Sequence, residues 1–398
     1  MLNKKKFLIL LIPSFLFNYL TLTVVDHDNN LSTFSSLLVF LFNFFNLILA
    51  YIFSYYGFIK SFTYFLIIIV SLFLLDTAAL KLQKNQSLQV YDKKLGWILN
   101  NNIKIEIEGS SKQNQKYKIN FSTSKIKGFR EYDEKQEYKK NILIVGDSYT
   151  AGPFASNDQM YYSYIKKELE KEGFFFNWYV AGGGGYGTLQ QYLIIKKYFN
   201  EINPDIIIHQ FCENDFENNS KKIEKNSILY NQYYFRPYLL NDKIVYDESF
   251  KGKIYKFFYR NSYLFKRIDK ILTNHRYKKN NSYFNKKIYE TDFEESKKIT
   301  SKIFGLIKDT IGNKVFYASI NCRSKDKKKF FAWEKILNEN EIISLSNSSL
   351  IIEDNAKKGQ DIFFSDGAHL NKNGNEIFGK NIGIELIKNL KENINLTK

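Results

Sequence analysis

The chain has 398 residues, a formal net charge of +17, four histidines and two cysteines. Two cysteines are too few for a disulfide-rich scaffold. The histidines and cysteines show none of the spacings typical of a metal site, so we expect neither a metal nor another cofactor.

The first 80 residues contain three long apolar runs. Each run is long enough to cross a bilayer, which takes about 20 apolar residues. No small-residue cleavage site follows Val25, so an uncleaved three-helix anchor at 1–80 is expected rather than a signal peptide. The runs cover residues 7–25, 33–59 and 62–80.

Charges around these runs predict their orientation. Lysines at positions 4–6 and 60 fall on one side, whereas the loop after the first run carries Asp26 and Asp28 but no lysine. The positive-inside rule then places the amino terminus in the cytoplasm. We therefore expect a multi-pass protein of the cell membrane whose remaining residues form an extracytoplasmic domain.

The rest of the chain is expected to form two parts. Residues 81–138 are typical of a small strand-rich extension, and residues 139–398 alternate strands and helices as in an α/β domain. An insertion at about 217–290 interrupts this alternation between the third and fourth strands. It is expected on the side of the sheet that carries the site, where it would shape substrate choice.

The first strand of the α/β part leads to a serine. Residues 142–145 are β-branched and aliphatic, as in a buried central strand. Gly146 ends the strand, and Ser148 follows in a polar turn before a helix predicted after Asn157. A serine there lies at the carboxyl edge of a parallel sheet, close to free N–H groups that can stabilise an oxyanion.

Two further segments follow predicted strands. A glycine-rich block at 180–188 follows an aromatic strand predicted at 174–179, and its glycines leave backbone N–H groups uncovered. Asn214 follows the strand predicted at 205–211 and can present its amide N–H to the same place. The match of the glycines to a dinucleotide fingerprint is weak, because any glycine-dense block satisfies it.

An aspartate and a histidine stand near the carboxyl terminus. Asp366 precedes His369 by three residues, and a helix follows. A histidine at this distance can use the aspartate as its orienter and act as a base toward a serine.

These segments together resemble the four blocks of the SGNH (GDSL-type) hydrolase family. The resemblance covers about residues 81 to 390 and implies a flavodoxin-like, three-layer α/β domain with a parallel sheet. Residues 91–97 and 120–130 are similar to the extension of membrane-tethered members. The four blocks are 146–148, the glycine block, 213–215 and 366–369.

The resemblance also implies roles for five residues, carried over position by position. Ser148 would be the nucleophile, His369 the general base and Asp366 the residue that orients it. The N–H groups of Ser148 and Gly185 and the side-chain amide of Asn214 would form the oxyanion hole.

Cys212 stands where family members usually have glycine. Cys212 and Cys322 follow the strands predicted at 205–211 and 314–321, which would be neighbours in a flavodoxin-like order. A disulfide could form between them outside the cytoplasm, but two free thiols are the expected default. His209 lies inside an apolar strand and is expected to be a core histidine.

Residues 251–287 are rich in lysine, arginine, tyrosine and phenylalanine. This pattern can indicate nucleic acid, which is not an expected partner of an exported, membrane-anchored domain. Three interpretations stay open. The segment forms an amphipathic helix around 254–272 on an anionic membrane, or a cap that attracts an acidic polysaccharide, or its lysines are simply solvated.

Three classes of function are compatible with this sequence. In the first, which we expect, the protein is an extracytoplasmic serine esterase that removes acyl groups, chiefly acetyl, from a carbohydrate or lipid. In the second, it is an O-acyltransferase that modifies envelope polysaccharide with a membrane protein as acyl donor, because no acetyl-CoA is expected outside the cytoplasm. The third, a non-catalytic glycan-binding module, is disfavoured by the five filled catalytic positions.

Overall fold

The computed structural model divides the chain into two compact units, Met1–Leu82 and Gln83–Lys398. In the first unit, only scattered positions between 43 and 79 are described. In the second, the described residues are 87–132, 138–227, 231–279 and 287–393.

The predicted membrane anchor falls mostly outside the described residues. The first apolar run, 7–25, lies wholly outside them, and the runs at 33–59 and 62–80 are described only at isolated positions. Over the described part of the chain, no helix is both long enough and apolar enough to cross a membrane.

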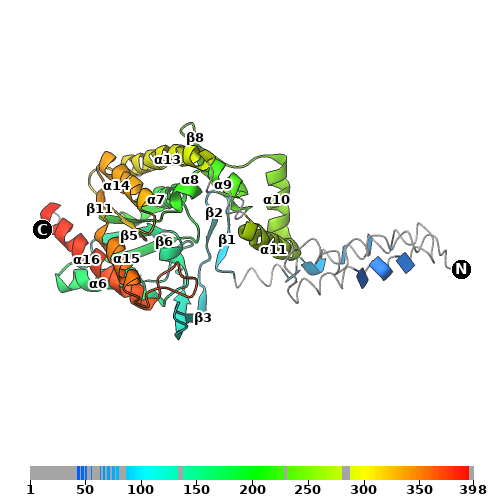
Figure 1. Cartoon of the computed structure of the whole chain (residues 1–398), viewed down its shortest axis with the longest axis horizontal. Helices are drawn as coiled ribbons and strands as arrows, with labels where there is room; N and C mark the ends of the chain where they lie inside the picture. The colour runs from blue at the N-terminus through cyan, green and yellow to red at the C-terminus, as the bar shows by residue number, and fades with distance from the viewer. Residues whose placement is uncertain are drawn as a thin grey trace. The chain divides into compact units, whose positions relative to one another are not determined.

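A five-stranded parallel sheet forms the centre of the second unit (Figure 1). Its spatial order is β11-β10-β7-β5-β6, so the first strand of the sheet in the chain lies between the second and the third. This is the flavodoxin-like order, and the predicted α/β class with a parallel sheet is confirmed. The strands are β5 (Asn141–Gly146), β6 (Asn177–Gly182), β7 (Ile206–Phe211), β10 (Phe316–Asn321) and β11 (Ile343–Leu345).

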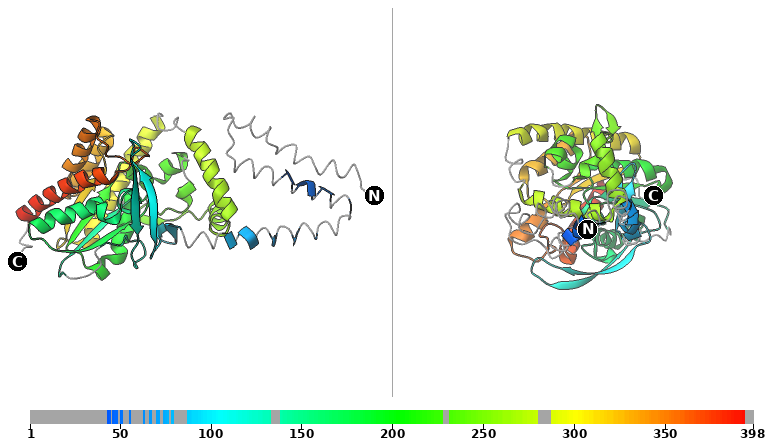
Figure 2. Two further views of the ribbon diagram at one scale, coloured as in Figure 1. Left: turned by 90° about the horizontal axis from the view of Figure 1, so that it is seen from below. Right: turned by 90° about the vertical axis from the view of Figure 1, so that its right-hand side faces the viewer.

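Alternate residues of each strand face opposite cores, which makes the unit three-layered. Leu143 and Val145 of β5 pack with one set of helices, whereas Ile142 and Ile144 pack with the other. Figures 1 and 2 show α6 and α16 side by side on one face of the sheet. The first set is α7 (Thr188–Ile202), α13 (Lys287–Ile311) and α14 (Lys327–Glu339); the second is α6 (Tyr161–Lys171), α15 (Asn347–Lys357) and α16 (Lys372–Asn393).

Strand β6 begins later than the aromatic residues suggested. The strand predicted at 174–179 starts at Asn177, which pairs with Asn141 of β5, and continues to Gly182. The Asn177 side chain accepts the N–H of Tyr138 at 3.0 Å, which fixes this start. Val180 is therefore a buried strand residue and not part of the glycine loop.

The segment before the sheet consists of two antiparallel hairpins. Their strands are short and carry a small separate core of Leu99, Ile103, Ile119 and Phe121. The strands are β1 (Gln89–Asp92), β2 (Gly96–Leu99), β3 (Lys104–Ser110) and β4 (Lys116–Ser122).

The insertion between β7 and β10 holds helices and one small hairpin. Its basic part forms two helices and not the single helix considered at 254–272. The break is at Ser262, whose backbone is extended (φ −130°, ψ 121°) and cannot continue the first helix. The elements are α8 (Asp215–Asn219), α9 (Lys221–Ser227), η2 (Asn231–Tyr234), β8 (Tyr238–Leu240), β9 (Lys243–Val245), α10 (Phe250–Asn261) and α11 (Tyr263–Lys279).

Candidate active site

Ser148 begins a short helix, α5 (Ser148–Ala151), directly after β5. The Asp147 carboxylate caps this helix by accepting the N–H of Tyr149 at 2.9 Å. Strand β5 lies between β6 and β7, where the direction of strand addition reverses. Such a switch point is where open α/β sheets bind ligands. The helix predicted after Asn157 starts as a 3-10 turn, η1 (Asn157–Gln159), and continues as α6.

Gly146 makes the sharp turn before Ser148 sterically feasible. A Cβ at this position would lie 2.1 Å from Oγ1 of Thr150 and 2.4 Å from Oε1 of Gln210. Both side chains belong to the local network, since Gln210 Oε1 accepts the Thr150 hydroxyl at 2.9 Å and the N–H of Asp147 at 3.1 Å.

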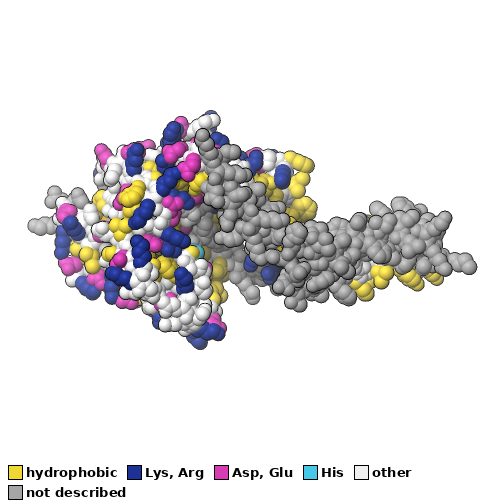
Figure 3. All heavy atoms as spheres, in the orientation of Figure 1, with side chains coloured by type: hydrophobic (Ala, Val, Ile, Leu, Met, Phe, Trp, Pro, Cys, Tyr) yellow, Lys and Arg dark blue, Asp and Glu magenta, His cyan; other side chains and the backbone are white. Residues whose placement is uncertain are grey.

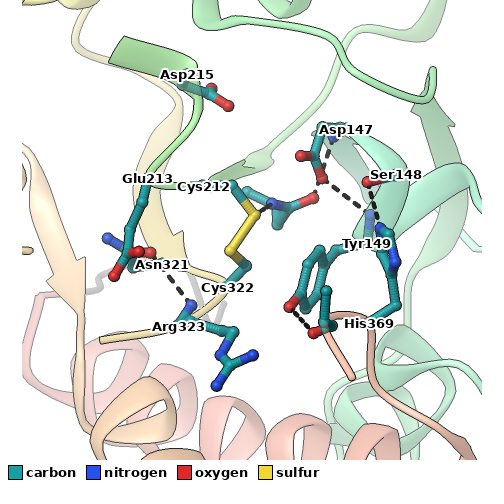
Figure 4. The surroundings of a disulfide bond; sticks show 12 residues. Asp147, Ser148, Tyr149, Cys212, Glu213, Asp215, Asn321, Cys322, Arg323 and His369 are labelled. Atoms are coloured by element: carbon teal, nitrogen blue, oxygen red, sulfur yellow. Dashed lines mark hydrogen bonds between the residues drawn. A yellow bond between two sulfur atoms is a disulfide. The ribbon is translucent and has the colours of Figure 1, made fainter. Parts of the chain in front are cut away.

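Two side-chain hydrogen bonds form a chain from Ser148 to His369 and from His369 to Asp366. Figure 4 shows Ser148 and His369. His369 Nε2 lies 2.7 Å from Oγ of Ser148. On the other side of the ring, His369 Nδ1 lies 2.6 Å from Oδ2 of Asp366. The structure thus brings together residues that are 221 positions apart in the chain.

Asp366 is held as a carboxylate by its surroundings. Burial acts to raise the pKa of Asp366, but hydrogen bonds from the His369 ring and from backbone N–H groups lower the pKa below its usual range. Those N–H groups belong to Ala368 and His369 and reach Oδ1 at 2.9 and 3.0 Å. An ionised carboxylate only accepts, so Nδ1 carries the proton of the neutral imidazole and Nε2 is free to accept from Ser148.

Two aromatic rings frame His369. The Phe154 ring stacks on the imidazole with a centroid distance of 3.8 Å and an interplanar angle of 12°. The Tyr149 ring lies at 5.1 Å, and its hydroxyl donates to the carbonyl of Ala368. Phe154 could not be singled out from the sequence, because aromatic residues make up 17% of the whole chain.

Three loops meet around Ser148 because their strands are adjacent in the order β6-β5-β7. Gly185, in the loop after β6, has a φ of +71°, a conformation that L side chains rarely adopt. Asn214, after β7, is the N-cap residue of α8. Burial raises the pKa of Asp147, against the hydrogen bonds made by Tyr149 N–H and by the Gln210 and Asn214 side chains. Asn214 is therefore close enough to the carboxylate beside Ser148 to influence its pKa.

The β1–β2 hairpin holds the glycine loop. The indole N–H of Trp97 donates to the carbonyl of Gly184 at 2.9 Å, and the Tyr186 hydroxyl donates to the carbonyl of Trp97 at 2.6 Å. Both partners flank Gly185, so this hairpin fixes the backbone that carries its N–H group.

The β3–β4 hairpin holds the loop that carries Asp366 and His369. The N–H of Ser365 donates to the carbonyl of Ser110 at 2.8 Å, and the N–H of Lys112 donates to the carbonyl of Phe363 at 2.9 Å. The sequence did not indicate that the extension contacts two of the site's loops.

The two cysteines form a disulfide with an S–S distance of 2.07 Å, so the expectation of two free thiols was wrong (Figure 4). The last residues of β7 and β10, Phe211 and Asn321, are paired, and each cysteine follows directly. The Cα atoms are 5.1 Å apart, within the range that a disulfide bridges. Cys212 does not adopt a positive φ, so the family's usual glycine is not needed for the turn.

Glu213 and Arg323 follow the two cysteines. Burial raises the pKa of Glu213 to about 7, although the N–H of Asp326 donates to this carboxyl at 2.8 Å. Arg323 pairs with Glu353 at 2.7 Å and also donates to the carbonyl of Gly367 at 3.3 Å. Arg323 therefore connects the end of β10 to the loop of His369.

His209 is a core histidine, as predicted. It is fully buried in β7, and burial lowers its pKa to about 3. Its Nδ1 lies 3.2 Å from the hydroxyl of Ser319 on the neighbouring strand. Within the described ranges, no group of three or more His, Cys, Asp or Glu residues is placed to hold a metal ion.

No protein-family profile matches the sequence, and no curated protein sequence matches it. Among solved structures, a family 3 carbohydrate esterase of Clostridium thermocellum is similar over 64% of this chain and 98% of that chain, with 14% identity and a TM-score of 0.36. A lipase/acylhydrolase from Enterococcus faecalis is similar over 62% of this chain and 95% of that chain, with 13% identity and a TM-score of 0.35.

An acetyl xylan esterase, AlAXEase, is similar over 62% of this chain and 99% of that chain, with 12% identity and a TM-score of 0.35. TM-scores in this range establish neither a family nor an activity.

Proposed function

We propose that the protein is a serine esterase that removes acyl groups, chiefly acetyl, from a carbohydrate or lipid. The observation that carries this proposal is the hydrogen-bond chain from Asp366 through His369 to Ser148 at the carboxyl edge of the sheet. A serine next to a base that is itself oriented by a carboxylate is the arrangement of an activated nucleophile.

In the proposed reaction, Oγ of Ser148 attacks the ester carbonyl carbon while its proton passes to Nε2 of His369. The tetrahedral adduct then breaks the ester C–O bond, and Nε2 returns the proton to the departing alcohol. Water attacks the acyl-serine with the same base, and collapse releases the carboxylic acid and restores the Ser148 hydroxyl.

The oxyanion of each adduct is proposed to be stabilised by three donors: the N–H groups of Ser148 and Gly185 and the side-chain amide of Asn214. Their positions after three adjacent strands support this assignment. Loss of one such donor typically slows the reaction by about 10²- to 10³-fold.

We also propose that the esterase faces the outside of the cell membrane and is held there by the apolar runs within residues 1–80. The lysine asymmetry of those runs supports the orientation. The Cys212–Cys322 disulfide supports it independently, because disulfides persist in oxidising compartments and are rare in the cytoplasm.

The proposal is tested by fluorophosphonate labelling and by hydrolysis of 4-nitrophenyl acetate, with the full chain in detergent. Ser148→Ala and His369→Ala should lose labelling. Their kcat should fall by about 10⁴- to 10⁶-fold, because a serine nucleophile and its histidine base act as a unit. Ser365→Ala is the matched control, since this exposed serine is next to Asp366 but outside the hydrogen-bond chain. Retained labelling and hydrolysis in Ser148→Ala would overturn the proposal.

Transfer of the acyl group to a glycan hydroxyl would pass through the same Ser148 ester. The products distinguish the two reactions: an esterase releases free acetate from an acetylated glycan, whereas a transferase yields a newly acetylated glycan and little free acetate. Release of acetate that depends on Ser148 is the result expected here.

A further inference from the structure

Helices α10 and α11 expose an apolar row of the same spacing on each helix. In both, the exposed side chains recur at positions i, i+4, i+7 and i+8, which is one face of a helix. Among the described residues of the second unit, no other pair of consecutive helices exposes so many large apolar side chains. They are Phe250, Ile254, Phe257 and Phe258 on α10, and Leu264, Ile268, Ile271 and Leu272 on α11.

The opposite side of this helix pair is already used for packing. The Tyr255 ring lies 4.8 Å from that of Tyr234, and the Tyr259 ring lies 5.1 Å from that of Phe235. The hydroxyl of Tyr255 also donates to Asp269 of α11 at 2.6 Å, which ties the two helices together. The exposed row therefore faces away from the contacts that hold the helices to the rest of the unit.

Basic residues flank the exposed row on α10 and are frequent along both helices. Residues 250–272 contain seven lysines and arginines and a single acidic residue, Asp269. At about 100° per residue, Lys251 and Lys253 fall on opposite sides of the row on α10. Figure 3 shows hydrophobic side chains at the outer edge of the molecule over α10, with Lys and Arg side chains beside them.

We propose that the α10–α11 face rests on an anionic lipid bilayer, with its apolar row in the headgroup boundary and its basic residues on the lipid phosphates. Lysine and arginine next to a row of Phe, Ile and Leu are the features of a helix that lies in a membrane interface. A soluble acidic polysaccharide would match the charge but not the exposed Ile and Leu side chains. This contact goes beyond the proposed esterase activity and requires no chemistry at Ser148.

The contact is tested with the full chain and vesicles whose phosphatidylglycerol carries bromine on its acyl chains, because bromine quenches tryptophan at short range. Phe257→Trp places the reporter on the exposed row, where the side chain is 56% exposed. Phe331→Trp on α14 is the matched control, since Phe331 is 60% exposed on a different helix. The wild-type protein is measured alongside, so that the fluorescence of the three native tryptophans can be subtracted.

We expect bromine to quench the added fluorescence of Phe257→Trp and not that of Phe331→Trp. Replacing the anionic lipid by brominated phosphatidylcholine should reduce this quenching, since each basic residue near an anionic surface contributes about 1 kcal/mol, or about fivefold in affinity.

Equal quenching of the two variants, or quenching that ignores lipid charge, would overturn the proposal. So would an unquenched Phe257→Trp whose emission shifts instead on adding a soluble acidic polysaccharide, or on self-association in detergent. Fluorophosphonate labelling is measured on the same variants. If Phe257→Trp is not quenched but labelling is intact, the lipid contact fails and the esterase proposal stands. If labelling is absent but Phe257→Trp is quenched, the esterase proposal fails and the lipid contact stands.

Discussion

The imidazole of His369 is fixed by contacts on both of its nitrogens and on one of its faces. Asp366 accepts from Nδ1, Ser148 meets Nε2, and the Phe154 ring lies flat against the ring. Rotation of the imidazole would break both hydrogen bonds and the stacking contact. The proposed base is therefore positioned for proton transfer before any substrate binds, which is the form of preorganisation that catalysis needs.

Asp366→Asn tests whether the tautomer of His369 matters. Oδ1 of Asp366 accepts two backbone N–H groups, so the amide oxygen of the asparagine should stay there and its NH₂ should face Nδ1. Nδ1 must then accept, which puts the proton on Nε2 and prevents it from acting as a base. We expect kcat to fall by about 10⁴-fold with the fold intact, measured by ester hydrolysis and circular dichroism.

Asp354→Asn is the control for this change, because Asp354 is an exposed residue of α15 whose carboxylate pairs with Lys358 and not with His369. It should keep wild-type kcat. An Asp366→Asn variant that is as active as this control would show that Asp366 does not orient the base.

Glu213 makes stability depend on pH near neutrality. Its pKa is raised from 4.5 to about 7 in the folded protein, so the folded state binds the proton more tightly than the unfolded state. Its contribution to folding is thus most favourable below about pH 4.5 and becomes steadily less favourable as the pH rises to about 7.

We expect Glu213→Gln to become more stable relative to wild type as the pH rises from 5 to 8. The difference between their free energies of unfolding should change by roughly the amount linked to the binding of a single proton. Urea titrations at each pH measure this difference. A difference that does not change with pH would show that Glu213 keeps an ordinary pKa.

At the scale of elements, the strands β7 and β10 determine the position of the loop that carries Asn214. The Cys212–Cys322 disulfide joins their ends, and the N–H of Cys322 donates to the carbonyl of Phe211 at 2.8 Å. Asn214 is only two residues beyond Cys212. The covalent link therefore limits how far the proposed oxyanion donor can move from Ser148.

Replacing both cysteines by serine should lower the free energy of unfolding by about 2–4 kcal/mol, the usual effect of losing a disulfide that closes a long loop. Because Asn214 loses its tether, kcat should fall as well, while KM changes little. Urea unfolding and ester hydrolysis measure the two effects, with wild type treated with dithiothreitol for comparison. Unchanged stability in the double variant would mean that the two cysteines are not bridged in solution.

Elements of regular pattern could be predicted from the sequence, whereas contacts between distant segments could not. Uninterrupted apolar runs specified the buried strands, because both faces of a parallel sheet are covered. The start of β6 was misplaced, since residues 174–176 are aromatic but Asn177 makes the first pairing. The break at Ser262 was missed because the surrounding pattern is helical on both sides.

The same distinction holds for the site. Ser148, Asn214 and the glycine loop could be placed because the carboxyl ends of neighbouring parallel strands share one edge. The Phe154 ring could not, because its contact with His369 joins segments that the sequence does not pair. Trp97 is a similar case, since its bond to Gly184 spans 87 residues. The disulfide was considered because its two strands were predicted to be neighbours, but two free thiols were expected.

At the scale of the whole second unit, the extension and the α/β part share one compact body. The hairpins β1–β2 and β3–β4 hold the glycine loop and the His369 loop, respectively. Arg130 of the extension also binds the α/β part, since its guanidinium is buried and donates to the carbonyl of Gly152 at 2.7 Å. The sheet supplies the positions of the site residues, and the extension fixes two of the loops that bear them.

The contacts between the β3–β4 hairpin and the His369 loop affect how the protein folds during synthesis. A ribosome produces Ser110 and Lys112 long before their partners Ser365 and Phe363, which follow much later in the chain. During that interval the β3–β4 hairpin has no partner loop, and contacts so far apart in the chain form slowly. A chain that has been made only as far as Ser148 therefore lacks its proposed base, and the proposed esterase chemistry can begin only after His369 has left the ribosome.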